Sequence, residues 1–226
     1  MFAAAAEIAG FLTLMADLAI RAIGYAPSAF IRAATSAEAQ SAALIIAFLA
    51  GVSEMLGQSV ILVVNRTPLY RFIASLAFTG ATYAITVVTW SAAVLATAPL
   101  TRLGAIGLGD FAAVTGVLAL AFAPRLLGVF SIAPYFGAAF AAMLEVWSMS
   151  LAIFGLHVGM DLPIGAAVFC AGAGFLGAYL FRSFAGRLFA KPLGRLHHSV
   201  AGSALDKTPQ QILDDVFARL NDEAQS

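Results

Sequence analysis

Charged side chains are scarce in this sequence. Asp, Glu, Lys and Arg together make up 11% of its 226 residues, and 62% of the residues are hydrophobic. Soluble domains carry about 25% charged residues. The 12 basic and 12 acidic side chains cancel, so the chain has no positive surplus with which to bind nucleic acid. This composition excludes a soluble domain and predicts an integral membrane protein whose surroundings are the lipid bilayer.

Cysteine and histidine are also rare. A lone cysteine, Cys170, excludes an internal disulfide framework and a thiolate metal cluster within one chain. Of the three histidines, His157 ends an apolar segment and His197 and His198 lie in a basic tail, so none stands mid-span where it could ligate haem. The sequence has no phosphate loop, H-E-x-x-H or G-x-S-x-G motif. We therefore predict a protein that is not an enzyme and binds no metal or cofactor.

Long apolar segments predict the membrane spans. A bilayer core requires about 20 apolar residues per helix. The segments that meet this length without interruption are residues 41–64, 72–98, 134–156 and 162–181. A further segment, residues 103–132, contains Asp110, Pro124 and Arg125, and we expect it to be broken near Pro124 because proline removes a helical hydrogen bond. The sequence thus predicts an all-α polytopic bundle of about five spans.

The N-terminal part differs from these spans. Residues 1–24 place charged and small side chains on one face and apolar ones, such as Ile8, Leu12 and Met15, opposite. This pattern favours an amphipathic helix lying in the membrane interface, and a sixth span is the alternative. We expect residues 25–40 to be a linker. The predicted organisation is an N-terminal helix and linker, a transmembrane bundle and a basic tail, at residues 1–40, 41–181 and 182–226.

The tail ends in a segment typical of a short amphipathic helix. Thr208 can cap its start, Pro209 suits the first turn, and Gln211 completes a capping box. One apolar stripe follows, made of Ile212, Val216 and Leu220. Either this helix rests on the protein's own membrane domain, or the stripe docks a partner protein.

Basic residues near the span ends predict the orientation. A cytoplasmic C-terminus would place seven of them on the cytoplasmic side: Arg66, Arg71, Arg125, Arg182, Arg187, Lys191 and Arg195. The other side would keep three: Arg21, Arg32 and Arg102. The bias favours a cytoplasmic C-terminus. The alanine-rich, cysteine-poor composition suggests the inner membrane of a bacterium.

Two glutamates lie at membrane depth, Glu54 close to the middle of residues 41–64 and Glu145 close to the middle of residues 134–156. An ionised carboxylate in hydrocarbon costs about 2.5 kcal/mol or more. We therefore expect both to face the bundle interior, where residues 72–98 present a hydroxyl-rich face. The predicted buried polar cluster consists of Glu54, Gln58, Tyr83, Thr86, Glu145 and Ser148.

Two interpretations compete for this cluster. Intramembrane carboxylates commonly mark ion pathways and proton relays. Protonated glutamates can instead hold helices together by hydrogen bonds to amides and hydroxyls. We expect no Lys, Arg or His at the same depth, and this expectation favours the structural interpretation. In the last span, small residues at four-residue steps predict close helix packing within the bundle or in an oligomer. These residues include Cys170, Gly174 and Ala178.

From Asp110 onward, about half of the chain resembles the Yip family, five-span proteins named for their interaction with Ypt/Rab GTPases, and its bacterial members in particular. The resemblance is carried by Phe111, Ala123-Pro124, Pro134-Tyr135-Phe136-Gly137, Trp147-Ser148 and Gly155-Leu156-His157-Val158-Gly159. It implies a five-helix bundle that organises membranes or membrane complexes. The long N-terminal helix, the charged C-terminal helix and the cytoplasmic C-terminus depart from the family's pattern, and no residue here matches a known GTPase contact.

These observations together predict a non-catalytic accessory or scaffold subunit that organises a membrane protein complex or a membrane region. Its expected partners are other membrane subunits or further copies of itself. The alternative is a small proton- or cation-coupled transporter that uses Glu54 and Glu145.

Overall fold

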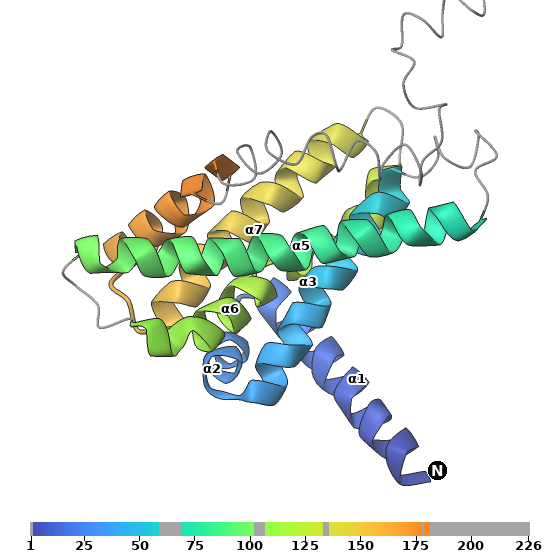
Figure 1. Ribbon diagram of the computed structural model, residues 1–226, viewed down its shortest axis with the longest axis horizontal. Coiled ribbons are helices and arrows are strands. Elements are labelled where there is room, and N and C mark those ends of the chain that lie inside the picture. The colour runs from blue at the N-terminus through green and yellow to red at the C-terminus, as the bar shows by residue number, and fades with distance from the viewer. Residues whose placement is uncertain (1, 59–68, 102–106, 133–135, 178, 181–226) are drawn as a thin grey trace, which may run out of the picture. The chain divides into compact units, whose positions relative to one another are not determined.

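The computed structural model describes residues 2–58, 69–101, 107–132, 136–177 and 179–180, and over these it contains helices and no strands (Figure 1). All of them belong to one compact unit, Met1–Phe184. The predicted tail and its stripe of Ile212, Val216 and Leu220 lie outside the described residues. The labelled elements are α1 (Phe2–Ile23), α2 (Pro27–Thr35), α3 (Ala37–Gln58), α5 (Leu69–Thr97), η1 (Ala98–Thr101), η2 (Leu108–Asp110), α6 (Phe111–Leu120), η3 (Ala123–Ile132) and α7 (Gly137–Gly159).

Four helical segments are long and apolar enough to cross a membrane: Ala37–Gly57, Phe72–Thr97, Phe111–Ile132 and Gly137–Gly159. A shorter apolar helix, Ile164–Gly177, follows. The prediction of a helical bundle of about five spans is confirmed. The first span begins at Ala37 rather than at residue 41, and residues 59–64 of the predicted segment 41–64 lie outside the described residues.

The break expected near Pro124 is present. The span Phe111–Ile132 consists of α6, a short turn at Ala121 and Phe122, and the 3-10 helix η3. The Ala121 amide still donates to the carbonyl four residues back, but the Phe122 and Arg125 amides donate to carbonyls three residues back. Pro124, which has no amide hydrogen to donate, lies inside this change of hydrogen bonding. The tighter 3-10 geometry carries Arg125 and the residues after it toward α3, which η3 contacts.

The linker predicted at residues 25–40 is instead mostly helical. Helix α2 begins with Pro27 in its first turn, where the missing amide hydrogen costs nothing, and it buries Ala29, Phe30 and Ala33 against α6 and α7. Tyr25, in a left-handed conformation with φ of 57°, makes the turn between α1 and α2. The apolar face of this short helix was missed because it has little more than two turns.

Helix α1 packs on α3. Its buried residues are Leu14, Met15, Leu18, Ala19 and Ala22. Met15 belongs to the apolar face predicted from the sequence, whereas two other residues of that face, Ile8 and Leu12, are 61% and 57% exposed. The four candidate spans found among the described residues do not include α1, and its place in the membrane interface stays a prediction.

The helix Ile164–Gly177 packs against α5 through small residues. A Cβ added to Gly174 would lie 2.6 Å from Val94 Cγ2 and 2.9 Å from Trp90 Cδ1. The Trp90 indole donates a hydrogen bond to the Ala171 carbonyl (3.1 Å), and its ring meets the Phe175 ring edge to face. Glycine is needed here because the tryptophan occupies the space that a side chain would fill.

We expect Gly174→Leu to lower the free energy of unfolding by about 1–3 kcal/mol, because the new side chain must displace Trp90 and Val94. The matched control is Gly172→Leu on the same helix, where an added Cβ meets no atom of the described residues within 4 Å. Thermal unfolding of the purified protein in detergent measures both. Equal losses in the two variants would contradict this packing.

Candidate functional site

Arg125 lies at the centre of a polar network inside the bundle. Its Nη1 donates to Tyr83 Oη (2.8 Å) and to Glu54 Oε2 (3.2 Å), and its Nη2 is 3.5 Å from Glu145 Oε1. The Tyr83 hydroxyl in turn donates to Glu54. We name these four residues the Arg125 network. It joins α3, α5, η3 and α7, which supply one residue each.

Close contact between α3 and η3 brings Arg125 to Glu54. Ser53 Oγ donates to the Leu126 carbonyl (2.7 Å) and accepts from the Val129 amide (3.0 Å), so the residue before Glu54 binds the backbone directly after Arg125. Gly128 permits the approach, since a Cβ there would lie 3.0 Å from Glu54 Cα. The backbone fixes the pair in place, and the long arginine side chain then has a short distance to span.

Tyr83 reaches the network across a second close approach. A Cβ added to Gly51 would lie 2.9 Å from Tyr83 Cγ, so the missing side chain lets the Tyr83 ring lie directly on α3. The guanidinium carbon of Arg125 is 5.6 Å from the centre of the Tyr83 ring and 5.5 Å from that of Phe122. Aromatic faces attract a cation, so these two rings also stabilise the guanidinium.

Arg125 corrects two expectations from the sequence. The expectation that no basic residue accompanies the glutamates is wrong, because Arg125 contacts both. Arg125 also lies inside the candidate span Phe111–Ile132, so it does not belong among the loop charges that predict orientation. Without it the bias is six basic residues against three, which has the same direction.

The other predicted members of the cluster do not join the network. Thr86 donates to the Thr82 carbonyl of its own helix (2.8 Å), and the hydroxyls of Thr79, Thr82 and Thr89 do likewise with carbonyls three or four residues back. Ser148 is buried, but its hydroxyl has no hydrogen-bond partner among the described residues. The side chain of Gln58 lies outside the described part of the chain.

Glu145 does not face the interior as expected. Its side chain is 58% exposed, whereas those of Arg125 and Glu54 are 16% and 26% exposed. The buried face of α7 is instead made of Gly137, Leu144, Ser148, Leu151, Ala152, Gly155 and Leu156. Glu145 borders this face and reaches Arg125 from the edge, which leaves part of its carboxylate on the surface of a helix long enough to cross a membrane.

The structure describes two of the three packing residues predicted in the last span. Cys170 is fully buried beside Thr97, and Gly174 packs on α5 as described above. Ala178 lies outside the described residues. Cys170 thus occupies a small-residue position in a helix contact. The described residues hold no group of three His, Cys, Asp or Glu side chains that could bind a metal ion.

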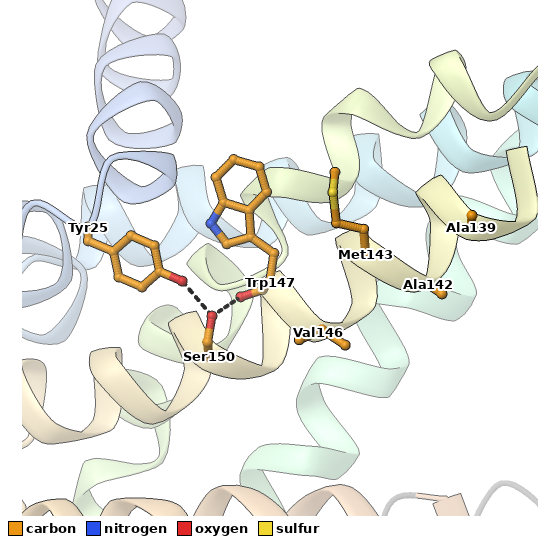
Figure 2. Close-up of a pocket in the computed structure, with 7 residues that line it drawn as sticks. All are labelled: Tyr25, Ala139, Ala142, Met143, Val146, Trp147 and Ser150. Atoms are coloured by element: carbon orange, nitrogen blue, oxygen red, sulfur yellow. Dashed lines mark hydrogen bonds between the residues drawn. The ribbon is translucent and has the colours of Figure 1, made fainter. Parts of the chain in front are cut away.

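A shallow groove of about 670 Å³ lies along the exposed face of α7. Tyr25, Trp147 and Ser150 line one end, and Ala139, Ala142 and Val146 line the rest (Figure 2). The Tyr25 hydroxyl is 2.5 Å from Ser150 Oγ, which donates to the Trp147 carbonyl (2.7 Å). These contacts hold the turn after α1 against α7 and close that end of the groove. The groove could not be predicted from the sequence, because Tyr25 and Ser150 are distant in the chain.

We expect Arg125→Met to lower the free energy of unfolding by about 3–5 kcal/mol, because it leaves carboxylates without their counter-charge. Adding Glu54→Gln in the same chain should restore part of this loss, with a coupling of about 0.5–3 kcal/mol in a double-mutant cycle. Chemical unfolding in detergent measures each variant.

The matched control for this cycle is Arg21→Met. Arg21 pairs with Asp17 on the exposed side of α1, with side chains 53% and 43% exposed, and such pairs contribute about 0–1 kcal/mol. The network would not hold the bundle together if Arg125→Met behaved like Arg21→Met.

The half-buried Ser53 and the buried Ser148 should respond oppositely to loss of the hydroxyl. Ser53→Ala breaks two hydrogen bonds to the backbone of η3 and should cost about 1–3 kcal/mol. Ser148→Ala removes a buried hydroxyl with no partner in the described part of the chain, and should leave stability unchanged or raise it. Melting temperatures in one detergent compare the two, and a clear loss in Ser148→Ala would reveal an additional partner of that hydroxyl.

Comparison with protein-family models, with curated proteins and with solved structures finds no significant match to this chain. The resemblance to the Yip family therefore stays a prediction from the residues quoted above. What the chain does has to be inferred from its own geometry.

Proposed function

We propose that this multi-pass membrane protein is a non-catalytic accessory or scaffold subunit of a membrane assembly. The observation that carries the proposal is that the polar side chains inside the bundle bind one another. Arg125, Glu54, Tyr83 and Glu145 bind one another across four elements of the bundle. Groups committed in this way join helices, and a protein whose function is to present a defined surface to a partner needs such a rigid arrangement.

The hydroxyl groups support the same proposal. A polar path across a membrane needs side chains that offer hydrogen bonds to a passing ion or solute. The threonines of α5 instead satisfy their hydroxyls on carbonyls of their own helix, as Thr82 and Thr86 do at 2.9 and 2.8 Å. The threonine face of α5 is therefore rich in hydroxyl groups, but these hydroxyls are already bonded within the helix and offer few hydrogen bonds to an ion or solute.

The proposal includes a location. We place the protein in the inner membrane of a bacterium with its C-terminus in the cytoplasm, on the strength of the composition and of the remaining bias of basic residues. The Yip-like segments agree with a role in organising membranes or membrane complexes.

Proton- or cation-coupled transport is the second candidate, and one observation favours it. Two carboxylates share a single guanidinium, so one of them can exchange a proton or a cation without leaving Arg125 unpaired. Exchange of partners around one arginine is a physical basis for coupling a proton to a movement of helices.

We expect the purified protein in liposomes loaded with a pH-sensitive dye to show no proton flux above that of protein-free liposomes. The reason is that Arg125, Glu54 and Tyr83 bind one another, and the α5 threonines bind carbonyls of their own helix, so these groups are not free to pass a proton. The full chain, Glu54→Gln and the control Glu38→Gln, which alters an exposed glutamate at the start of the same helix, are compared under a pH gradient with sodium or potassium outside.

Flux that Glu54→Gln abolishes and Glu38→Gln preserves would establish transport and remove the accessory role. The accessory role also predicts a stable complex in the membrane. Native mass spectrometry after gentle extraction should find the chain in a complex with another membrane protein at fixed stoichiometry. A chain found alone in every mild detergent would contradict the proposal.

A further inference from the structure

The Arg125 network has an uncovered side, and Glu145 forms it. At 58% exposure its side chain is far more open than that of Arg125 at 16%, and its oxygen stands 3.5 Å from the guanidinium while the other two contacts of Arg125 are 2.8 and 3.2 Å. Glu145 lies within the candidate span Gly137–Gly159. A carboxylate at that place would meet lipid unless another group covers it.

The network also carries a surplus of negative charge. Among the described residues it contains one guanidinium and two carboxylates, so its net charge is −1 when all are ionised. Tyr83 adds a hydroxyl that already donates to Glu54. Glu54 accepts from Arg125 Nη1 at 3.2 Å, whereas Glu145 is 3.5 Å from Nη2, so we assign the surplus to Glu145, the more distant and more exposed carboxylate. The missing element is therefore a positive charge that approaches from outside α7.

The surface around Glu145 suits a helix. Ala138, Ala142 and Glu145 follow one another at steps of four and three residues, so they lie along one line of α7 and all are exposed. Beside this line runs the groove that Ala139, Ala142 and Val146 line and that Tyr25 closes at one end (Figure 2). Small side chains let the backbone of a second helix come close, which is how helices pack in a membrane.

We propose that this face of α7 binds a transmembrane helix of a partner protein that carries one lysine or arginine at the depth of Glu145. The inference rests on the accessory role and names the chemistry of the partner. The basic side chain neutralises the surplus charge of the network, and the rest of the helix lies in the groove. Charge pairing at membrane depth selects this partner over other apolar helices, since a helix without a cation leaves Glu145 uncompensated.

A second copy of the chain fits this face poorly. A symmetric contact through α7 would bring two copies of this face together, each with its own surplus carboxylate, because a two-fold interface joins the same patch on both subunits. Two carboxylates would then share a low-dielectric contact without a new cation. The Arg125 of the other copy does not supply one, since it is held by Glu54 and Tyr83 inside its own bundle.

The test uses the full chain in lipid vesicles and synthetic transmembrane peptides of about 20 leucine and alanine residues. One peptide has a central lysine, a second a central leucine and a third a central glutamate, and each carries a dansyl acceptor. Energy transfer from the protein's two tryptophans reports binding, because Trp147 lines the groove. We expect the lysine peptide to bind at least about tenfold more tightly than the leucine peptide, and the glutamate peptide to bind least.

Three variants separate charge from shape. Glu145→Gln should abolish the preference for lysine, whereas the control Glu38→Gln should keep it. Ala142→Leu, which leaves every residue of the network in place, should weaken binding of all peptides by filling the groove. This variant keeps the test valid if Glu145→Gln fails to fold. Equal binding of the lysine and leucine peptides, or a lysine preference that survives Glu145→Gln, overturns the inference.

The remaining outcomes are also decisive. Energy transfer between donor- and acceptor-labelled copies of the chain that Ala142→Leu abolishes would assign the face to self-association and overturn the inference. Proton flux measured in the same vesicles tests the accessory role separately. A chain that shows flux and still prefers lysine loses the accessory role and keeps the docking site. A chain without flux and without preference keeps the role and loses the site.

Discussion

The attraction between Arg125 and its two carboxylates is the interaction on which the arrangement of this bundle depends. A guanidinium cannot be left unpaired among apolar helices, because the energy of a charge away from water exceeds what helix packing returns. Arg125 therefore has to find its counter-charges, and the bonds to Glu54 and Tyr83 and the ion pair with Glu145 set the rotation and depth of α3, α5 and α7 relative to η3. Removing one partner of such a pair leaves a charge without compensation, so the network penalises arrangements in which these groups do not meet.

The same interaction explains where the close backbone contacts occur. Gly51 admits the Tyr83 ring, Gly128 admits the backbone at Glu54, and Ser53 binds the backbone on both sides of Leu127. Each contact shortens the distance that a polar side chain has to cover. The 3-10 helix η3 belongs to this set, because the change of hydrogen bonding at Pro124 turns the second half of the span toward α3. The break at Pro124 would weaken an isolated helix. Here it places Arg125 beside Glu54 and Glu145, and among the described residues no other long cationic side chain reaches them.

The sequence predicted the class of the fold and part of the site for identifiable reasons. Apolar length predicts spans, and proline predicts a break, because both effects act within one segment. Glu54, Tyr83 and Glu145 could be selected because a polar group in an apolar helix is conspicuous by itself. The basic partner of the glutamates could not be selected, since Arg125 beside Pro124 looks like the end of a span and its hydrogen-bond partners Tyr83 and Glu54 lie 42 and 71 residues away along the chain. Helix α7 is apolar on all sides, so its pattern could not show that Glu145 borders the buried face rather than lying in it. Thr86 was misplaced because a threonine in a helix can satisfy its hydroxyl on its own backbone.

The asymmetry of the network connects its structural role to a partner. If the two carboxylates were equally covered, the bundle would be electrically complete only with a proton on one of them, and its surface would be indifferent to what surrounds it. Because Glu54 is enclosed and Glu145 is not, the uncompensated negative charge of the network lies on one face of α7. The pairing of Arg125 with its carboxylates then holds the helices in register. The same pairing determines which side of the molecule binds a partner. A single surplus carboxylate is enough to distinguish this face from the rest of an apolar surface, because the hydrocarbon of the bilayer offers it no counter-charge.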